Sequence, residues 1–194
     1  MSGLPDKELL DLFRKEESRN YAFNLLVRQY QKPLYGFIRR MVTDHDETQD
    51  VLQNVFIKVW TGLDGFRGGS QLFTWLYRIA HNESLTHLRR MRRGLFTSHE
   101  TVLERLTTTL DRSEHFSGDA IQRALQLAVM RLPPKQRAVF TMKYFDTLTY
   151  EAISEITGTS VGALKSTYHI ASGKIERWLT AEQPGPTDQT LRKA

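Results

Sequence analysis

Residues 149–179, TYEAISEITGTSVGALKSTYHIASGKIERWL, predict two helices separated by a tight turn. Gly158 can supply the left-handed backbone conformation that such a turn needs. Ser154 is small enough to let the two helices approach closely, and Ser160 is placed to cap the second helix. The apolar positions that face inward are Ile153, Ile156 and Leu164. This arrangement is typical of a helix-turn-helix motif.

A helix-turn-helix motif inserts its second helix into the major groove of DNA, where exposed side chains read the base edges. The residues that we expect to contact DNA lie along this helix: Ser160, Ala163, Lys165, Ser166, His169 and Lys174. Two ordinary packed helices are the alternative, because short matches to this motif are common. Taken alone, the motif favours duplex DNA binding over simple packing.

The chain before this motif also reads as helical. Apolar stripes recur at helical spacing over residues 23–41, 51–59, 72–88, 121–132 and 136–145. Pro33 interrupts the first stripe and should kink that helix or start a new one, because proline removes a backbone donor. The segment GLDGFRGGS at 62–70 reads as a loop, since its four glycines would be costly in a helix. The predicted fold class is all-α.

Residues 94–118 differ from the rest, because they are rich in serine and threonine and have weak apolar periodicity. We interpret them as a flexible linker with one short helix around Val102–Leu106. The polar tail at 183–194 is expected to be disordered. The sequence therefore predicts two small helical domains, at 1–93 and 119–182, joined by the linker.

The net charge of +5 favours a polyanionic partner, and the distribution of charge is more informative than the total. Residues 41–66 hold five acids and one base, whereas residues 67–93 hold six bases and one acid. Adjacent segments of opposite sign indicate two faces for two different partners.

Composition also excludes some classes of protein. The chain has no cysteine, so it can form neither a disulfide framework nor a thiolate metal site. No apolar run approaches the ~20 residues that cross a bilayer, and the first residues do not resemble a secretory signal. We expect a cytoplasmic protein without membrane insertion and without a cofactor.

The basic segment 66–93, FRGGSQLFTWLYRIAHNESLTHLRRMRR, interleaves arginines with aromatic residues. Aromatic faces stack on unpaired bases, at about 1–3 kcal/mol each, and arginines neutralise phosphates. The combination suits melted DNA better than an intact duplex. The alternative is that Trp75 and Tyr77 are core residues while the arginines solvate the outer face of the helix.

The acidic segment 46–60, DETQDVLQNVFIKVW, carries a polar strip above a bulky apolar stripe. Asp50 and Gln53 share a helical face, and Asn54 lies one turn beyond Asp50. Such a strip could dock on a basic, partly apolar partner helix. A solvated surface helix is the competing interpretation.

The order of these signals resembles the sigma-70 family, and within it the extracytoplasmic-function (ECF) group of RNA polymerase sigma factors. The strings that carry the resemblance are AFNLLVRQYQKPLYGFIRRMV (22–42), DETQDVLQNVFIKVWTGLDGFRG (46–68), TWLYRIAHN (74–82) and LPPKQRAVFTMKYFDTLTYEAISEITGTSVGALKS (132–166). They are similar to regions 2.1, 2.2, 2.3–2.4 and 4.1–4.2 of the family, in that order. Together the four strings cover most of the chain outside the linker and tail, and their shared order makes the resemblance specific.

The resemblance implies a non-enzymatic initiation factor that binds core RNA polymerase and promoter DNA. The clamp helices of the largest polymerase subunit would contact Asp50, Gln53 and Asn54, supported by Phe56 and Trp60. Family members usually carry an acid where this chain has Asn54, so a hydrogen bond would replace a charge contact there. The flap of the second-largest subunit would hold the C-terminal domain. In many relatives an anti-sigma factor clamps both domains, which makes such a factor a further candidate partner.

The resemblance also divides the promoter between the two domains. The −10 element would be recognised and melted by Arg67, Gly68, Gly69, Ser70, Gln71, Trp75, Tyr77, Arg78, Asn82, Arg89 and Arg90. In the family this loop captures a base flipped out of the non-template strand. Many relatives have an acid at the Gly69 position, so the base preference is expected to differ. The −35 element would lie on the helix-turn-helix, through a contact that relies on shape because this helix has few arginines.

Two other functions compete with this one. A conventional helix-turn-helix regulator accounts for 149–179 but leaves the acidic and the aromatic–arginine helices without a role. A metal-dependent nuclease would draw its ligands from two groups: His81, Glu83 and His87, or Asp44, Asp46 and Asp50. The two histidines are six residues apart, off the helical spacing that places two ligands on one face, and acids are expected at a helix start in any case. The sequence thus argues against an enzyme.

Overall fold

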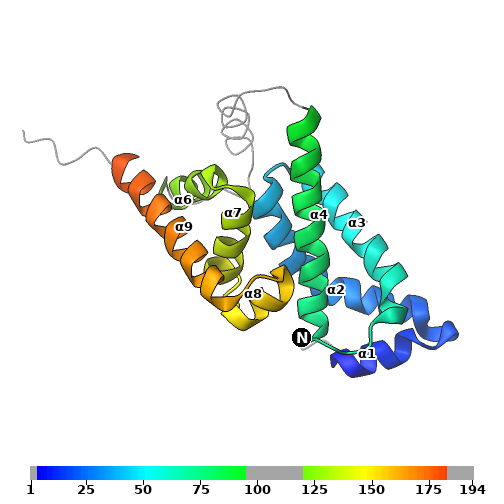
Figure 1. The fold of residues 1–194 in the computed structure, drawn as a ribbon. Coiled ribbons are helices and arrows are strands. Elements are labelled where there is room, and N and C mark those ends of the chain that lie inside the picture. The colour runs from blue at the N-terminus through cyan, green and yellow to red at the C-terminus, as the bar shows by residue number, and fades with distance from the viewer. Residues whose placement is uncertain (1–3, 95–119, 183–194) are drawn as a thin grey trace, which may run out of the picture.

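The computed structural model describes residues 4–94 and 120–182, and all regular structure within these ranges is helical, which confirms the all-α prediction there. The N-terminal unit, residues 4–94, holds α1 (Asp6–Phe13), η1 (Glu16–Ser18), α2 (Arg19–Val42), α3 (His45–Gly62), η2 (Leu63–Gly65) and α4 (Leu72–Gly94). The C-terminal unit, residues 120–182, holds α6 (Ala120–Arg131), α7 (Pro134–Phe140), the π-helix η4 (Thr141–Phe145), α8 (Tyr150–Thr157) and α9 (Val161–Glu182) (Figure 1).

The predicted linker and its short helix lie outside the described residues, except Gly94, which ends α4. The predicted tail lies outside them as well. The proposed domain boundaries remain a prediction.

Helix α2 is the central element of the N-terminal unit and packs against α1, α3 and α4. It continues through Pro33, so of the two outcomes expected there a new helix does not form. Proline removes only one backbone hydrogen bond, and the side chains of Tyr30 and Leu34 on either side of it are buried in the core. Tertiary packing thus holds the helix together across this position.

The start of α3 shows why the acids that precede its apolar stripe favour a helix. The Asp44 carboxylate accepts a hydrogen bond from the backbone N–H of Glu47 at 3.0 Å, which caps the helix. Asp46 and Glu47 lie in the first turn, where the helix dipole favours negative charge. Val51, Val55 and Val59 then form the buried stripe. The prediction of a helix at 46–60 is confirmed.

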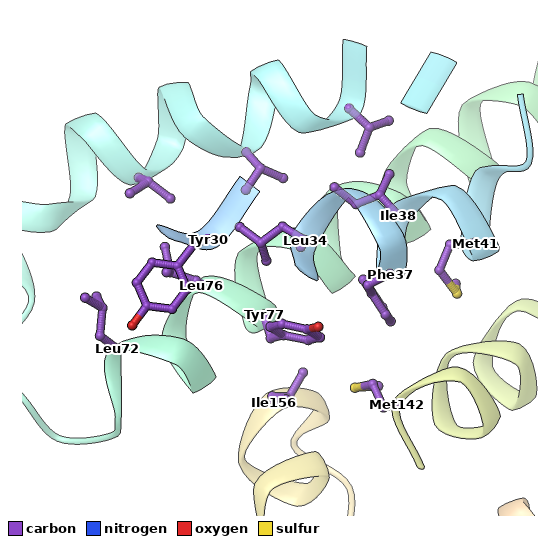
Figure 2. Close-up of a cluster of buried hydrophobic side chains, with 14 of the residues drawn as sticks. Tyr30, Leu34, Phe37, Ile38, Met41, Leu72, Leu76, Tyr77, Met142 and Ile156 are labelled. Carbon is purple, nitrogen blue, oxygen red and sulfur yellow. The ribbon is translucent and has the colours of Figure 1, made fainter. Parts of the chain in front are cut away.

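The two units share an apolar core, and the C-terminal unit also holds a second cluster around Val129, Phe140 and Ile175. The cluster around Leu34 and Phe37 of α2 and Leu76 and Tyr77 of α4 continues into the C-terminal unit. The members it gains there are Ala138, Val139, Met142, Ile153, Ile156 and Leu164. In Figure 2, Met142 and Ile156 point at Tyr77 from the side opposite α2. The largest contact between the units is that of α4 with α8, and α2 also contacts α6, α7 and η4 (Figure 1).

A buried arginine adds a polar connection to this core. Arg137 of α7 is only 7% exposed, and its guanidinium donates to the carbonyl oxygen of Met41 at 2.7 Å, in the last turn of α2. The same group donates to the carbonyls of Met130 and Leu132, where α6 ends. Carbonyls in a last helical turn lack intrahelical partners, and the helix dipole favours a cation there. Arg137 therefore satisfies the ends of two helices from different units.

Replacement of Arg137 by Met should lower the free energy of unfolding by about 2–4 kcal/mol, because buried carbonyls of both units would lose their donor. Urea unfolding followed by far-UV circular dichroism measures this change. Arg28→Met, at an exposed position of α2, is the matched control and should change stability by less than about 0.5 kcal/mol. Equal effects of the two substitutions would contradict this role for Arg137.

Candidate nucleic-acid interface

The helix-turn-helix forms as its sequence predicts. Thr149 caps α8 by accepting a hydrogen bond from the N–H of Ala152 at 3.1 Å. Gly158 ends the helix with φ +69°, the left-handed conformation expected there, and its N–H donates to the Ser154 carbonyl at 2.8 Å. Ser160 accepts a hydrogen bond from the N–H of Ala163 at 3.4 Å at the start of α9. The inward positions Ile153, Ile156 and Leu164 are all buried.

The outer face of α9 presents most of the residues predicted to read duplex DNA. Those exposed to solvent are Ser160, Ala163, Lys165, Ser166 and His169. Lys174 is half-buried, and its ammonium donates to Gln136 Oε1 on α7 at 3.0 Å, which places it closer to the helix packing than expected. The Ser166 hydroxyl donates to the Gly162 carbonyl of its own helix at 3.2 Å.

A tyrosine missed by sequence reasoning stands beside this face. Tyr150 opens α8, and the ammonium groups of Lys143 and Lys165 lie 4.8 and 5.9 Å from the centre of its ring. Two cations thus lie near the N-terminus of α8, where an anion such as a phosphate is favoured. Of these three residues only Lys165 was predicted to contact DNA. Lys143 and Tyr150 are distant from it in the sequence and come close to it only in the folded chain.

The glycine-rich loop 66–71 is anchored at one side and open at the other. Phe66 is buried and packs on Trp75, with ring centres 5.3 Å apart. Gly68 has φ +74°, which a side chain would strain. The predicted base-contacting residues of this loop are exposed, except Ser70, which is half-buried: Arg67, Gly68, Gly69, Ser70 and Gln71.

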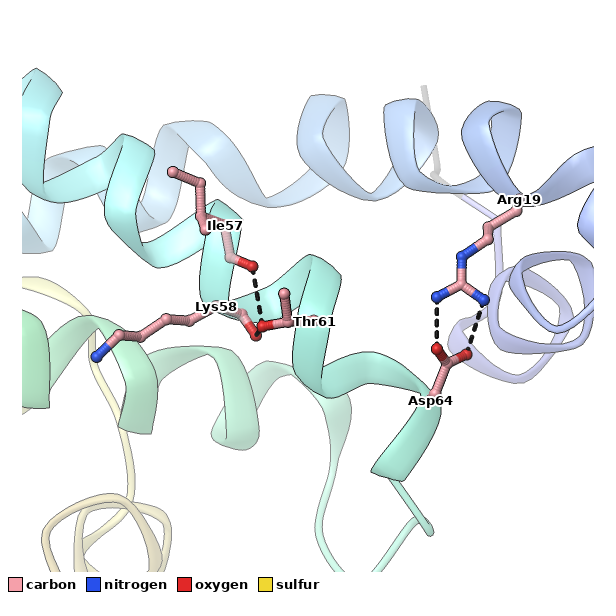
Figure 3. Close-up of polar contacts among 5 residues, drawn as sticks. All are labelled: Arg19, Ile57, Lys58, Thr61 and Asp64. Carbon is pink, nitrogen blue, oxygen red and sulfur yellow. Dashed lines mark hydrogen bonds and ion pairs between the residues drawn. The ribbon is translucent and has the colours of Figure 1, made fainter.

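An ion pair fixes the approach to this loop. The Arg19 guanidinium donates with both terminal nitrogens to the two carboxylate oxygens of Asp64 in η2. The central carbon of the Arg19 guanidinium lies 4.3 Å from the centre of the Phe13 ring and 5.1 Å from that of the Trp60 ring. The hydrogen bond from Arg19 holds the pKa of Asp64 below its usual value. Figure 3 shows the two side chains facing each other across the gap between α2 and η2.

The aromatic–arginine helix α4 divides its predicted residues between core and surface. Asn82, Arg89 and Arg90 are exposed, and Trp75 is half-buried. Tyr77 requires a correction: it is 1% exposed, and its hydroxyl donates to the Pro33 carbonyl at 3.4 Å. Because its ring packs between Phe37 and Phe73, it cannot stack on a base in this structure.

Arg78 is already engaged within the chain. Its Nε and Nη2 donate to the carbonyl oxygen of Glu155 at 3.1 and 2.7 Å. Glu155 lies in the last turn of α8, so this contact joins the two units. A side chain predicted to bind DNA is therefore used here to hold the helix-turn-helix.

The outward face of α3 is open to a partner. Asp50, Gln53 and Asn54 are exposed along it, as predicted. Ile57 extends the same face and is 55% exposed, which is high for a large apolar side chain. Sequence reasoning missed Ile57, although it lies three and four residues beyond Asn54 and Gln53 and outside the valine stripe.

Phe56 and Trp60 lie beneath this face and support it. The Trp60 ring meets Phe13 and Phe23 edge to face, with centres 5.5 and 4.9 Å apart. Phe56 meets Phe23 in the same geometry, at 6.4 Å. Such contacts between three helices give α3 a rigid backing.

The residues considered for a metal site make other contacts. His81 is buried, and burial lowers its pKa. Glu83 accepts a hydrogen bond from Lys58 at 2.6 Å, and the His87 ring lies 3.2 Å from a carboxylate oxygen of Glu47. Asp44 caps α3. Across residues 4–94 and 120–182, no three histidine or acidic side chains gather as metal ligands would.

None of the helices in the described part of the chain combines the length and the apolar character that a membrane span needs.

Comparison with protein families gives two matches along the chain. The model for Sigma-70 region 2 matches residues 26–94, and that for Sigma-70, region 4 matches residues 122–175. The first match includes α3, the glycine-rich loop and α4, and the second includes the helix-turn-helix.

Curated relatives match over nearly the whole chain. The RNA polymerase sigma-H factor of Pseudomonas aeruginosa is 33% identical over 190 residues, which cover 90% of this chain and 93% of that protein. The ECF RNA polymerase sigma-E factor of Haemophilus influenzae is 31% identical over 183 residues, covering 89% and 94%. That of Escherichia coli K12 is 34% identical over 179 residues, covering 84% and 88%.

Solved structures share the fold. The sigma factor RpoE of Bartonella quintana, in complex with the anti-sigma factor NepR, superposes with a TM-score of 0.65 at 22% identity, covering 83% of this chain and 98% of that one. CnrH in complex with the cytosolic domain of CnrY gives a TM-score of 0.67 at 20% identity, covering 92% and 99%.

Proposed function

Because this chain belongs to the sigma-70 family, as an ECF RNA polymerase sigma factor, we propose how its surfaces divide the family's task. Sigma factors bind core RNA polymerase and direct it to specific promoters. The task thus needs one surface for polymerase and two for promoter DNA. A helix-turn-helix regulator that acts without polymerase is excluded by the family assignment.

The polymerase surface is the outward face of α3. The observation that carries this assignment is the strip of Asp50, Gln53, Asn54 and Ile57, which is exposed and backed by a rigid aromatic layer. An apolar side chain flanked by an acid and two amides complements a partner helix that is basic and partly apolar. The clamp helices of the largest subunit are the partner that the family resemblance implies.

The −10 surface combines the loop 67–71 with the exposed side of α4. Gly68 and Gly69 have no side chains, so the DNA backbone can approach the loop closely there, and the exposed Arg67 lies next to them. Asn82, Trp75 and the arginines at 89 and 90 continue the surface along α4. Arginines neutralise phosphates while a half-buried tryptophan supports a base outside its stack. Tyr77 does not contact DNA in this proposal, because it is buried in the core beneath α4.

The −35 surface is the outer face of α9, with Lys165, Ser166 and His169 toward base edges. Tyr150 and Lys143 extend it toward the phosphate backbone. With few cations on the reading helix, the contact depends on shape as much as on charge.

The remaining assignments follow the family. The flap of the second-largest subunit is the partner of the C-terminal unit, and an anti-sigma factor is a further partner. A similar solved structure, in which the sigma factor RpoE is bound to the anti-sigma factor NepR, supports the latter. The protein acts in the cytoplasm, where core polymerase is found, and catalyses no reaction of its own.

Substitution of Asp50 and Gln53 by Ala should weaken binding to sigma-free core RNA polymerase at least about tenfold, or ~1.4 kcal/mol, because both side chains lie on the exposed face of α3. Co-elution on gel filtration and titration of labelled protein measure this loss. Gln31→Ala removes the same kind of side chain at an exposed position of α2, away from α3, and is the control that should bind normally. Unchanged affinity of the double variant, with intact helicity, would refute the assignment.

A further inference from the structure

Helix α9 carries one large apolar side chain on its solvent side. Ile170 is 50% exposed, whereas the other large apolar residues of α9 that the structure describes are buried or half-buried. Single exposed apolar residues are common on protein surfaces, so exposure alone assigns no role to Ile170. Its neighbours on the helix determine what it can contact.

Ile170 lies in the middle of the outer face of α9. Ser166 and Ala163 precede it by four and seven residues, so the three side chains form one row along the helix, and both neighbours are exposed. The buried residues Leu164 and Ile175 belong to a separate row. Ile170 is therefore part of the surface that we assign to the −35 element and not part of the core.

This face has few groups that can identify a base by hydrogen bonds. Residues 161–176 contain no arginine, asparagine or glutamine, the side chains that form bidentate pairs with guanine or adenine. The Ser166 hydroxyl donates to a carbonyl of its own helix at 3.2 Å, and the Thr167 hydroxyl does the same at 2.8 Å. A hydroxyl has a single proton, so in this conformation both groups can only accept a hydrogen bond from DNA. Lys165 and His169 are the exposed side-chain donors that remain, and base selection has to draw on contacts of another kind as well.

The charge of the segment favours DNA over a protein as the partner of this row. Residues 161–175 hold no acid, and the exposed Lys165 lies on the same outer face. A face without carboxylates admits the phosphates that border the major groove. An apolar side chain there meets base edges, and thymine is the base whose major-groove edge carries a methyl group. Isoleucine and that methyl group can bury each other without leaving a polar group unpaired.

We propose that Ile170 is a specificity-determining residue of the −35 surface and that it contacts the 5-methyl group of a thymine in the major groove. The inference rests on the proposed function, because it takes the outer face of α9 as the surface that binds duplex DNA. The −35 element then contains an A·T pair whose thymine faces Ile170. Uracil lacks only the methyl group of thymine, so it removes this contact while every hydrogen-bonding group of the base pair stays.

Selection from duplexes of random sequence identifies the base pair. The full-length protein is combined with sigma-free core RNA polymerase, and the duplexes that the complex retains are amplified and sequenced. In the enriched motif upstream of the −10 segment, the parent protein should favour thymine at a position where Ile170→Ala shows no preference. The rest of the motif should be the same for both proteins, because alanine shortens the exposed side chain and is compatible with a helix.

Uracil substitution then isolates the methyl group. When uracil replaces this thymine in the enriched duplex, the parent complex should bind about fourfold more weakly, as expected for the loss of one buried methyl group. The Ile170→Ala complex should bind the thymine and uracil duplexes equally well. Fluorescence anisotropy of the labelled duplex measures both affinities.

Ile121→Ala is the matched control. Ile121 is 66% exposed on α6, so this variant makes the same chemical change away from the outer face of α9. It should select the same motif as the parent protein and show the same loss of affinity on the uracil duplex. Far-UV circular dichroism checks that both variants keep their helicity.

Two results would overturn the inference while the proposed function stands. One is an upstream motif that Ile170→Ala selects unchanged, which would favour a protein contact for this side chain, and the other is equal binding of thymine and uracil duplexes by the parent complex. Failure of the parent protein to join core polymerase, or selection of no upstream motif, would instead refute the proposed function and the inference with it.

Discussion

The buried guanidinium of Arg137 is the constraint on which the arrangement of this molecule depends. It satisfies carbonyls at the end of α2 and at the end of α6, and these helices belong to different units. A buried cation is tolerated when its N–H groups find acceptors, and here the carbonyl oxygens at two helix ends, which lack intrahelical donors, supply them. The apolar side chains around it follow: with α7 fixed against α2, Met142 and Ile156 come to rest on Tyr77.

This shared core sets the energy that separation of the two units would require. Separation of the units would expose apolar surface of α4 and α8 to water at about 25 cal/mol per Å². Asp146 of the C-terminal unit has one carboxylate oxygen without a hydrogen-bond partner among the described residues, which lowers the net gain from packing the two units together.

Sequence reasoning succeeded where structure is determined locally. The cap at Ser160, the left-handed Gly158 and the acids at the start of α3 each act within a few residues, so the helices and the turn could be predicted from them. It failed where burial depends on tertiary contacts. Periodicity placed Ile156 inside the helix-turn-helix, but it could not show that the same side chain also packs on α4.

The predicted interface shows the same limit. Tyr77 and Trp75 are both aromatic residues in a basic helix, yet only the fold buries the first and leaves the second half-exposed. Ile57 was missed although its spacing from Gln53 and Asn54 places it on the polar face, because apolar residues were assigned to the core by type; its exposure shows the difference. Arg78 shows the limit most clearly. It was predicted to bind DNA, but in the folded chain it donates to the carbonyl oxygen of Glu155, which the sequence alone could not show.

The central claim is that the two units share an apolar core, and cooperative unfolding tests it most directly. The chain has three tryptophans, so Trp60→Phe/Trp75→Phe leaves Trp178 on α9 as the reporter of the C-terminal unit. In urea, Trp178 fluorescence and far-UV circular dichroism should give one transition with the same midpoint and slope. If Trp178 fluorescence changed in a separate transition, before or after most of the helicity was lost, the units would be independent and the account would be contradicted.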